Sequence, residues 1–156
     1  MLYYIKPMKS CIDVANLFLK WANRDGDLIT NLKMQKLVYY AQAWHLVYFK
    51  EILFKNTILA WDFGPVVPDV YHEFKCFSSS PIKYKESGEE ENGFGKEQIK
   101  FLNACYGTFI KYSAFELVNM THNEDPWKDA YKKGPSTEIF PEAMRKFYSG
   151  MLKNKN

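Results

Sequence analysis

One segment, residues 31–49, constrains the fold more than any other part of this sequence. At helical spacing its apolar side chains point in every direction: Leu37, Ala41, Trp44 and Tyr48 share one face, and Tyr39, Leu46 and Phe49 share another. A helix that is apolar all round cannot leave either face in water. The run is also too short and too often interrupted for a bilayer, which needs roughly 20 apolar residues. We therefore predict a buried central helix that is capped by Thr30 or Asn31.

Three polar side chains lie inside this predicted helix: Gln35, Gln42 and His45. Burying a polar group without a hydrogen-bond partner is costly. We therefore expect each of them to find a partner in the core, and we interpret them as structural residues rather than as ligand-binding groups.

Capping patterns locate other helices. Ser10 with Asp13 and Ser113 with Glu116 have the spacing of a capping box, and Asp125 is a candidate N-cap before Pro126. Together with the apolar periodicity, these signals predict helices over about 11–23, 31–49, 68–77, 96–112, 114–121 and 125–133, and one that begins at residue 141.

The expected fold class is mainly α, with a small two- or three-stranded β element in a single compact helical domain. The short apolar runs 58–63 and 82–85 are the predicted strands. The acidic, glycine-containing stretch 86–95 has no periodicity and is expected to be mobile. We expect an extension over residues 1–9, a domain over 10–152 and a tail over 153–156, with Met8 as an alternative start.

Charge and cysteine content restrict the class of protein. The 156-residue chain carries 21 Lys and Arg against 18 Asp and Glu, a net charge of +3, without the concentrated positive field of a typical DNA-binding protein. Its three cysteines are odd in number and far apart, which favours buried thiols in a reducing compartment. The first ten residues lack a signal-peptide pattern. We expect a cytoplasmic protein without a membrane segment.

No pattern in the sequence indicates catalysis, a cofactor or a metal. His45, His72 and His122 lack metal-ligand spacing with each other or with the cysteines. The apolar neighbours of Cys11 and Cys105 predict inert thiols. No glycine-rich loop joins a predicted strand to a helix, and Gly88, Gly93 and Gly95 lie in an acidic stretch that would repel phosphate. We therefore predict no enzyme activity, no cofactor and no metal site.

Three motifs in a fixed order resemble one family. They are TNLKMQKLVYYAQAWH at 30–45, AWDFGPVVPDVY at 60–71 and THNEDPW at 121–127. Together they resemble the SocA-like, or Panacea, antitoxin domain, also described as GepA-like phage-associated proteins, over about residues 10–134.

The resemblance implies a bacterial or prophage protein that neutralises a toxin encoded by an adjacent gene through direct protein contact. The resemblance also implies a protein that, as in at least one family member, delivers its toxin to a Clp protease. The alternative is a DNA-associated regulator of its own operon or prophage, although no helix-turn-helix segment with a basic helix is evident. The identity of the toxin and the oligomeric state stay open.

The motif residues have mostly structural interpretations, because a Gly-Pro corner can turn a short strand into a helix while aromatic side chains pack on the core. They are Gln35, Lys36, Leu37, Tyr39, Gln42, Trp44, Trp61, Gly64, Pro65, Val66, Tyr71, Asp125, Pro126 and Trp127.

The candidate partner interface is the surface where this corner and the following helix meet an exposed strip of the central helix. Its residues are Lys33, Lys36, Asp69, His72 and Glu73. An aromatic content of 17% predicts that some rings are exposed there.

Overall fold

The computed structural model describes residues 9–154, so the predicted N-terminal extension lies almost entirely outside the described residues. The described part contains seven α-helices and a small antiparallel sheet, which confirms the predicted fold class. The helices are α1 (Cys11–Asp25), α2 (Asn31–Phe49), α3 (Pro68–Phe74), α4 (Lys96–Phe109), α5 (Ala114–His122), α6 (Asp125–Lys133) and α7 (Pro141–Lys153), with a 3-10 turn η1 (Lys75–Phe77) after α3. The strands are β1 (Leu59–Trp61), β2 (Gly64–Val66) and β3 (Thr137–Glu138).

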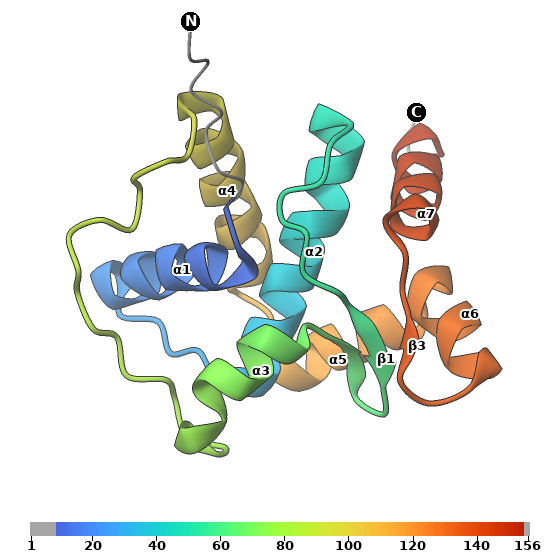
Figure 1. The fold of residues 1–156 in the computed structure, drawn as a ribbon, viewed down its shortest axis with the longest axis horizontal. Helices are drawn as coiled ribbons and strands as arrows, with labels where there is room; N and C mark the ends of the chain where they lie inside the picture. The colour runs from blue at the N-terminus through green and yellow to red at the C-terminus, as the bar shows by residue number, and fades with distance from the viewer. Residues whose placement is uncertain (1–8, 155–156) are drawn as a thin grey trace, which may run out of the picture.

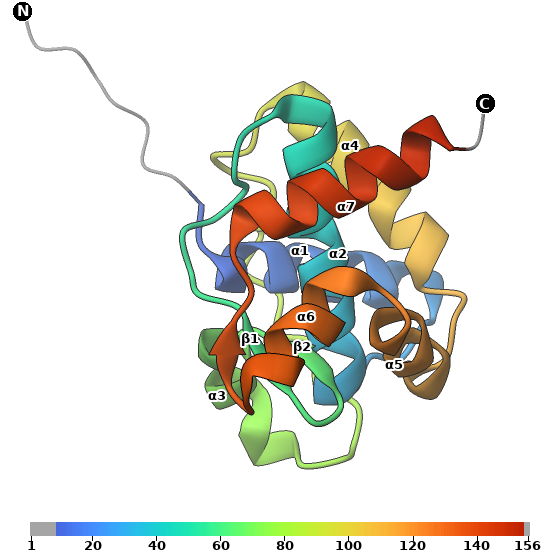
Figure 2. The same ribbon diagram turned by 90° about the vertical axis from the view of Figure 1, so that its right-hand side faces the viewer.

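Helix α2 is the centre of the molecule, as its all-round apolar pattern predicts. Thirteen of its 19 residues are buried. The helices α1, α3, α4, α5 and α7 pack around it, and α7 makes the most extensive contact. Figures 1 and 2 show α2 running between α4 and α7 in two perpendicular views. Among the described residues, no helix is long and apolar enough to cross a membrane.

The buried polar residues of α2 have partners, as expected. Gln42 is 2% exposed; its amide donates to the Phe54 carbonyl at 2.8 Å and its oxygen accepts from the Leu53 amide at 2.6 Å. His45 Nδ1 lies 2.7 Å from the Glu51 carbonyl, and burial lowers its pKa. Gln42 and His45 therefore hold residues 51–54, which follow α2 in the chain, against the helix.

Three of the four predicted caps are confirmed. Thr30 is the N-cap of α2, and its hydroxyl accepts from the Lys33 amide at 3.3 Å. The Ser10 and Ser113 hydroxyls accept from the amides at N3, and the N3 carboxylates accept from the cap amides. The assignment of Asp125 as an N-cap is wrong, because Asp125 is the first residue of α6 and Glu124 occupies the cap position without capping. The Glu124 carboxylate instead turns towards the core, where it accepts hydrogen bonds from tyrosines.

The sheet has the strand order β2-β1-β3. Leu59 pairs with Val66 and Trp61 with Gly64, which makes β1 and β2 a hairpin with a two-residue turn. The predicted strand at 82–85 is wrong: the partner of β1 on its other edge is β3, at residues 137–138. The Ile82 amide donates to the Ile29 carbonyl instead, so this run lies beside the start of α2.

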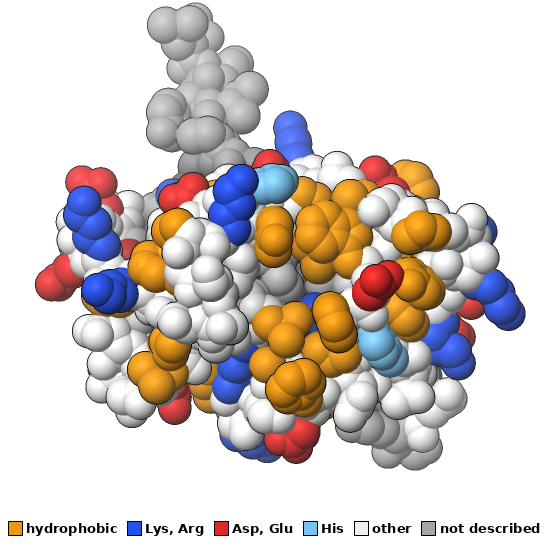
Figure 3. Space-filling model, turned by 90° about the horizontal axis from the view of Figure 1, so that it is seen from below, with side chains coloured by type: hydrophobic (Ala, Val, Ile, Leu, Met, Phe, Trp, Pro, Cys, Tyr) orange, Lys and Arg blue, Asp and Glu red, His pale blue; other side chains and the backbone are white. Residues whose placement is uncertain are grey.

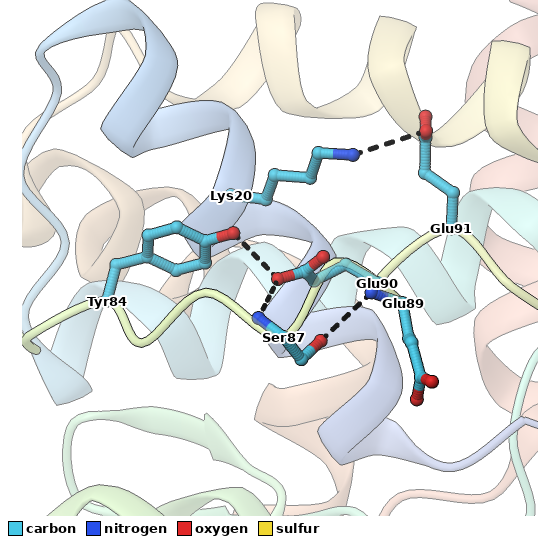
Figure 4. A network of polar contacts seen from close by, with 6 residues as sticks. All are labelled: Lys20, Tyr84, Ser87, Glu89, Glu90 and Glu91. Atoms are coloured by element: carbon cyan, nitrogen blue, oxygen red, sulfur yellow. Dashed lines mark hydrogen bonds and ion pairs between the residues drawn. The ribbon is translucent and has the colours of Figure 1, made fainter.

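The acidic stretch 86–95, which is expected to be mobile, contains turns and a local set of hydrogen bonds (Figure 4). Glu90 is 8% exposed and accepts hydrogen bonds from the Tyr84 hydroxyl at 2.7 Å and the Ser87 amide at 2.9 Å. These hydrogen bonds lower the pKa of Glu90 to about 2. This network closes the segment on itself, and the Lys20 ammonium group of α1, 3.2 Å from Glu91 Oε2, connects it to the body of the protein.

Candidate functional site

Polar residues of α2 hold the backbone of the segment 64–71. The Asn31 amide donates to the Tyr71 carbonyl at 3.1 Å, and the Gln35 oxygen accepts from the Val67 amide at 2.9 Å. Gln35 and Asn31 also bond to each other at 2.7 Å. The first motif therefore positions the second, which explains why both lie in one fold unit although they are separate in sequence.

Lys36 is buried beneath the hairpin. It is 0% exposed, and its Nζ donates to the Pro65 carbonyl at 3.2 Å. Desolvation lowers its pKa to about 7. The prediction that Lys36 marks an exposed strip is therefore wrong, and its ammonium group is not available to a partner at the surface. The reason is the hairpin, which covers this side of α2.

The third motif completes the hairpin from the other side. The Trp127 indole donates to the Trp61 carbonyl at 2.8 Å, and its ring stacks between His122 at 4.1 Å and Tyr131 at 4.6 Å. The Tyr131 hydroxyl donates to the Asp62 carboxylate in the hairpin turn. All three motifs therefore meet at β1 and β2.

The exposure of the motif residues fits a mostly structural role. The buried ones are Gln35, Lys36, Leu37, Tyr39, Gln42, Gly64, Pro65, Val66 and Pro126, and the half-buried ones are Trp44, Trp61 and Trp127. Tyr71 and Asp125 are exposed. Tyr71, expected to pack on the core, is 37% exposed and contacts Trp61 edge-on at 5.3 Å.

A groove lies beside the hairpin, and we call it the hairpin groove. It has a volume of about 630 Å³ and is lined by apolar side chains that include Leu32, Trp61, Phe63, Val66 and Tyr71. Phe63, in the two-residue turn, is 62% exposed. Viewed from the end of the molecule that carries α3 and the hairpin, hydrophobic side chains gather in patches (Figure 3). The prediction of exposed aromatic rings at this surface is confirmed.

One buried polar atom of Trp61, beside the groove, lacks a partner. The Trp61 Nε1 is buried and has no hydrogen-bond acceptor among the described residues. An unpaired buried donor is unfavourable for stability. Because this nitrogen is enclosed, the groove offers a partner its exposed rings rather than this donor.

The remaining interface candidates are divided between two positions. Asp69, His72 and Glu73 are exposed on α3. Lys33 is half-buried, and its Nζ donates at 2.6 Å to the Ile110 carbonyl, where α4 ends. Burial lowers the pKa of Lys33, and its contact stabilises a helix end in the way that cations do.

The groups considered for chemistry are dispersed. Within residues 9–154, no three His, Cys, Asp or Glu side chains form a group that could hold a metal. Cys11 and Cys105 are buried, as predicted, but Cys76 is exposed, which corrects the expectation that all three thiols are buried.

Sequence reasoning missed part of the hairpin groove. Phe63 lies in the second motif but is not among the predicted interface residues, and Leu32, Lys75 and Ser78 also line the groove. A signal for Phe63 existed, because a large apolar residue beside Gly-Pro in a turn has little protein to pack against.

These features define a helical protein whose motifs build a hairpin beside an apolar groove. The family model for the SocA-like antitoxins with the Panacea domain matches residues 34–128, and the chain belongs to this family. It is 44% identical over 145 residues to the protein named Antitoxin SocA of Caulobacter vibrioides (strain NA1000 / CB15N), covering 81% of this chain and 72% of that relative. No solved structure matches the chain.

Proposed function

We propose that this protein is a cytoplasmic antitoxin that binds a toxin protein encoded by an adjacent gene and neutralises it by direct contact, without catalysis. The observation that carries the proposal is the hairpin groove, with the exposed rings of Phe63 and Tyr71 at its wall. Membership of an antitoxin family supports the class of function.

The chemistry of the groove suits a protein partner. Exposed aromatic rings on a rigid support are typical anchors of binding energy, because little side-chain entropy is lost when they are buried. The hairpin is rigid because Gln35, Lys36 and Trp127 hold its backbone from two sides. A partner segment with apolar side chains that pack against the rings would complement this surface.

Co-expression tests the proposal. The product of the adjacent gene should arrest growth when expressed alone, and this protein should restore growth and co-purify with it. The double variant Phe63→Ala, Tyr71→Ala should bind the toxin at least tenfold more weakly and fail to restore growth. Phe140→Ala is the matched control, because Phe140 is 60% exposed outside the groove.

Two outcomes would contradict the proposal or its site. A neighbour that is harmless, or toxic but unaffected by this protein, rules out the antitoxin function. Salt-dependent binding to the operon's own promoter then tests the regulator alternative. A double variant that binds as tightly as the Phe140→Ala control moves the toxin contact away from the hairpin groove.

Delivery to a Clp protease is a separate part of the proposal, and it predicts a shortened lifetime of the toxin. The half-life of the toxin should fall when this protein is present and return when the protease is deleted. An unchanged half-life with restored growth would leave neutralisation by contact alone.

A further inference from the structure

A second groove, which we call the α2–α4–α7 groove, lies away from the hairpin. Side chains of α2 form its floor, and α4 and α7 form its walls, on the two sides of α2 seen in Figure 1. Its volume is about 530 Å³. Half of its lining side chains are aromatic: Tyr40, Trp44, Tyr48, Phe101, Phe109, Tyr112 and Tyr148.

These rings are arranged around the groove in contact with one another. Trp44 lies 5.4 Å from Tyr148 and 6.1 Å from Tyr48, and Tyr48 lies 5.8 Å from Phe101 edge-on. Tyr48 is 59% exposed. The faces of such rings carry partial negative charge and attract cations.

A carboxylate lies among these rings. Glu124 Oε1 accepts from the Tyr40 hydroxyl at 2.7 Å and from the Tyr148 hydroxyl at 2.8 Å. Its second oxygen, Oε2, accepts no hydrogen bond from the described residues and is not fully enclosed. Burial raises the pKa of Glu124, so its charge is poorly compensated by the protein alone.

We propose that the α2–α4–α7 groove binds a protein segment that presents a lysine or arginine flanked by apolar residues. The cationic group pairs with Glu124 Oε2, and the apolar flanks and the aliphatic stem lie along the aromatic walls. Charge complementarity selects this occupant: a neutral apolar segment would leave the carboxylate desolvated without a partner, and an acidic segment would be repelled by it.

This inference does not depend on the antitoxin proposal. None of the residues that line this groove lines the hairpin groove. The protein thus has two recognition surfaces of different chemistry, one built by the hairpin and one built by the three helices.

The probes are fluorescent 14-residue helical peptides with leucines along one face and arginine, lysine, citrulline or leucine at the centre. Citrulline has nearly the shape of arginine but no charge. Fluorescence anisotropy with the full chain should give at least about tenfold tighter binding for the arginine and lysine peptides than for the other two. Similar affinities for arginine and citrulline, or no binding by any peptide, would overturn the proposal.

Variants assign the binding to this groove. Glu124→Gln should reduce the preference for arginine over citrulline to less than about twofold. Glu97→Gln, which removes an exposed carboxylate from α4 outside the groove, should leave the preference for arginine unchanged. Ala104→Trp fills the groove from an exposed position on α4 and should weaken every peptide at least tenfold.

Circular dichroism checks the fold of each variant. If Glu124→Gln unfolds, the comparison of the arginine and citrulline peptides still tests whether binding needs a positive charge. The Ala104→Trp variant still tests whether the peptides bind in this groove. Unchanged binding by a folded Ala104→Trp variant, or a preference for arginine that survives in a folded Glu124→Gln variant, would refute the proposed site.

Discussion

The Nζ of Lys36 lies 3.2 Å from the carbonyl oxygen of Pro65, and no part of the lysine is exposed to solvent. The two residues are 29 positions apart in sequence. The contact is made possible by Gly64, because a Cβ atom there would lie 2.7 Å from both Lys36 Cε and Thr121 Oγ1. The central helix, the hairpin and α5 are therefore fitted together at a single glycine.

Gly64→Ala is predicted to destabilise the protein by about 2 kcal/mol or more. Gly64 has a φ of +106°, which is unfavourable for alanine, and the methyl group added by the substitution would overlap the neighbouring side chains. Urea unfolding measures the change. Gly107→Ala is the control: no atom lies within 4 Å of a Cβ at this helical position, so the same substitution should stabilise α4 by about 0.5–1 kcal/mol. A Gly64→Ala variant as stable as the wild type would contradict the packing.

Lys36 is predicted to make the stability rise with pH. Its pKa is about 7 in the folded protein against 10.5 for an ordinary lysine. Between these values the unfolded chain binds a proton that the folded chain does not, so raising the pH favours folding, and below pH 7 both states are protonated. From pH 7 to 9 the wild type should gain about 2 kcal/mol relative to Lys36→Met.

Parallel urea titrations of the two proteins at pH 7, 8 and 9 measure this difference. Other groups that titrate in this range are common to both proteins, so their effects cancel. A constant difference would mean that Lys36 keeps an ordinary pKa.

The sequence predicted those features of the fold that depend on neighbouring residues. The capping boxes at Ser10 and Ser113 are made within four residues, and the burial of α2 follows from its own apolar pattern. Gln42 and His45 could be placed in the core because they interrupt that pattern. Local signals of this kind do not require knowledge of the tertiary contacts.

Most of the errors concern contacts between distant segments. The N-cap predicted at Asp125 is a local signal that was wrong, and the neighbouring Glu124 instead accepts hydrogen bonds from Tyr40 and Tyr148. Strand β3 has two residues, and its pairing with Leu59 and Ala60 depends on where α6 ends. The burial of Lys36 depends on a hairpin that begins more than twenty residues later, whereas a lone lysine is normally exposed. The same limit explains why the α2–α4–α7 groove, with Glu124 between two tyrosines, was not foreseen.

Gln42→Met is predicted to cost about 2–4 kcal/mol of stability. The methionine has a similar size, but it leaves the Leu53 amide and the Phe54 carbonyl without partners in the core. Thermal or urea unfolding measures the loss. Lys100→Met provides a control, because this unbranched side chain is exposed on α4 and its replacement should change the stability by less than about 0.5 kcal/mol. Equal stability of the two variants would mean that the hydrogen bonds of Gln42 to Leu53 and Phe54 do not contribute to the stability of the protein.

The native protein is predicted to react with one equivalent of iodoacetamide at pH 8, at Cys76. Cys76 is exposed, whereas burial raises the pKa of both Cys11 and Cys105 to about 12 and shields their sulfur atoms. The thiolate is the reactive form, so the two buried residues should react only after unfolding. Mass spectrometry should find one adduct in buffer and three in urea. Cys76→Ser should abolish the native adduct and leave two in urea, while rapid native labelling of Cys105 would show that the α2–α4–α7 groove opens along its α4 wall.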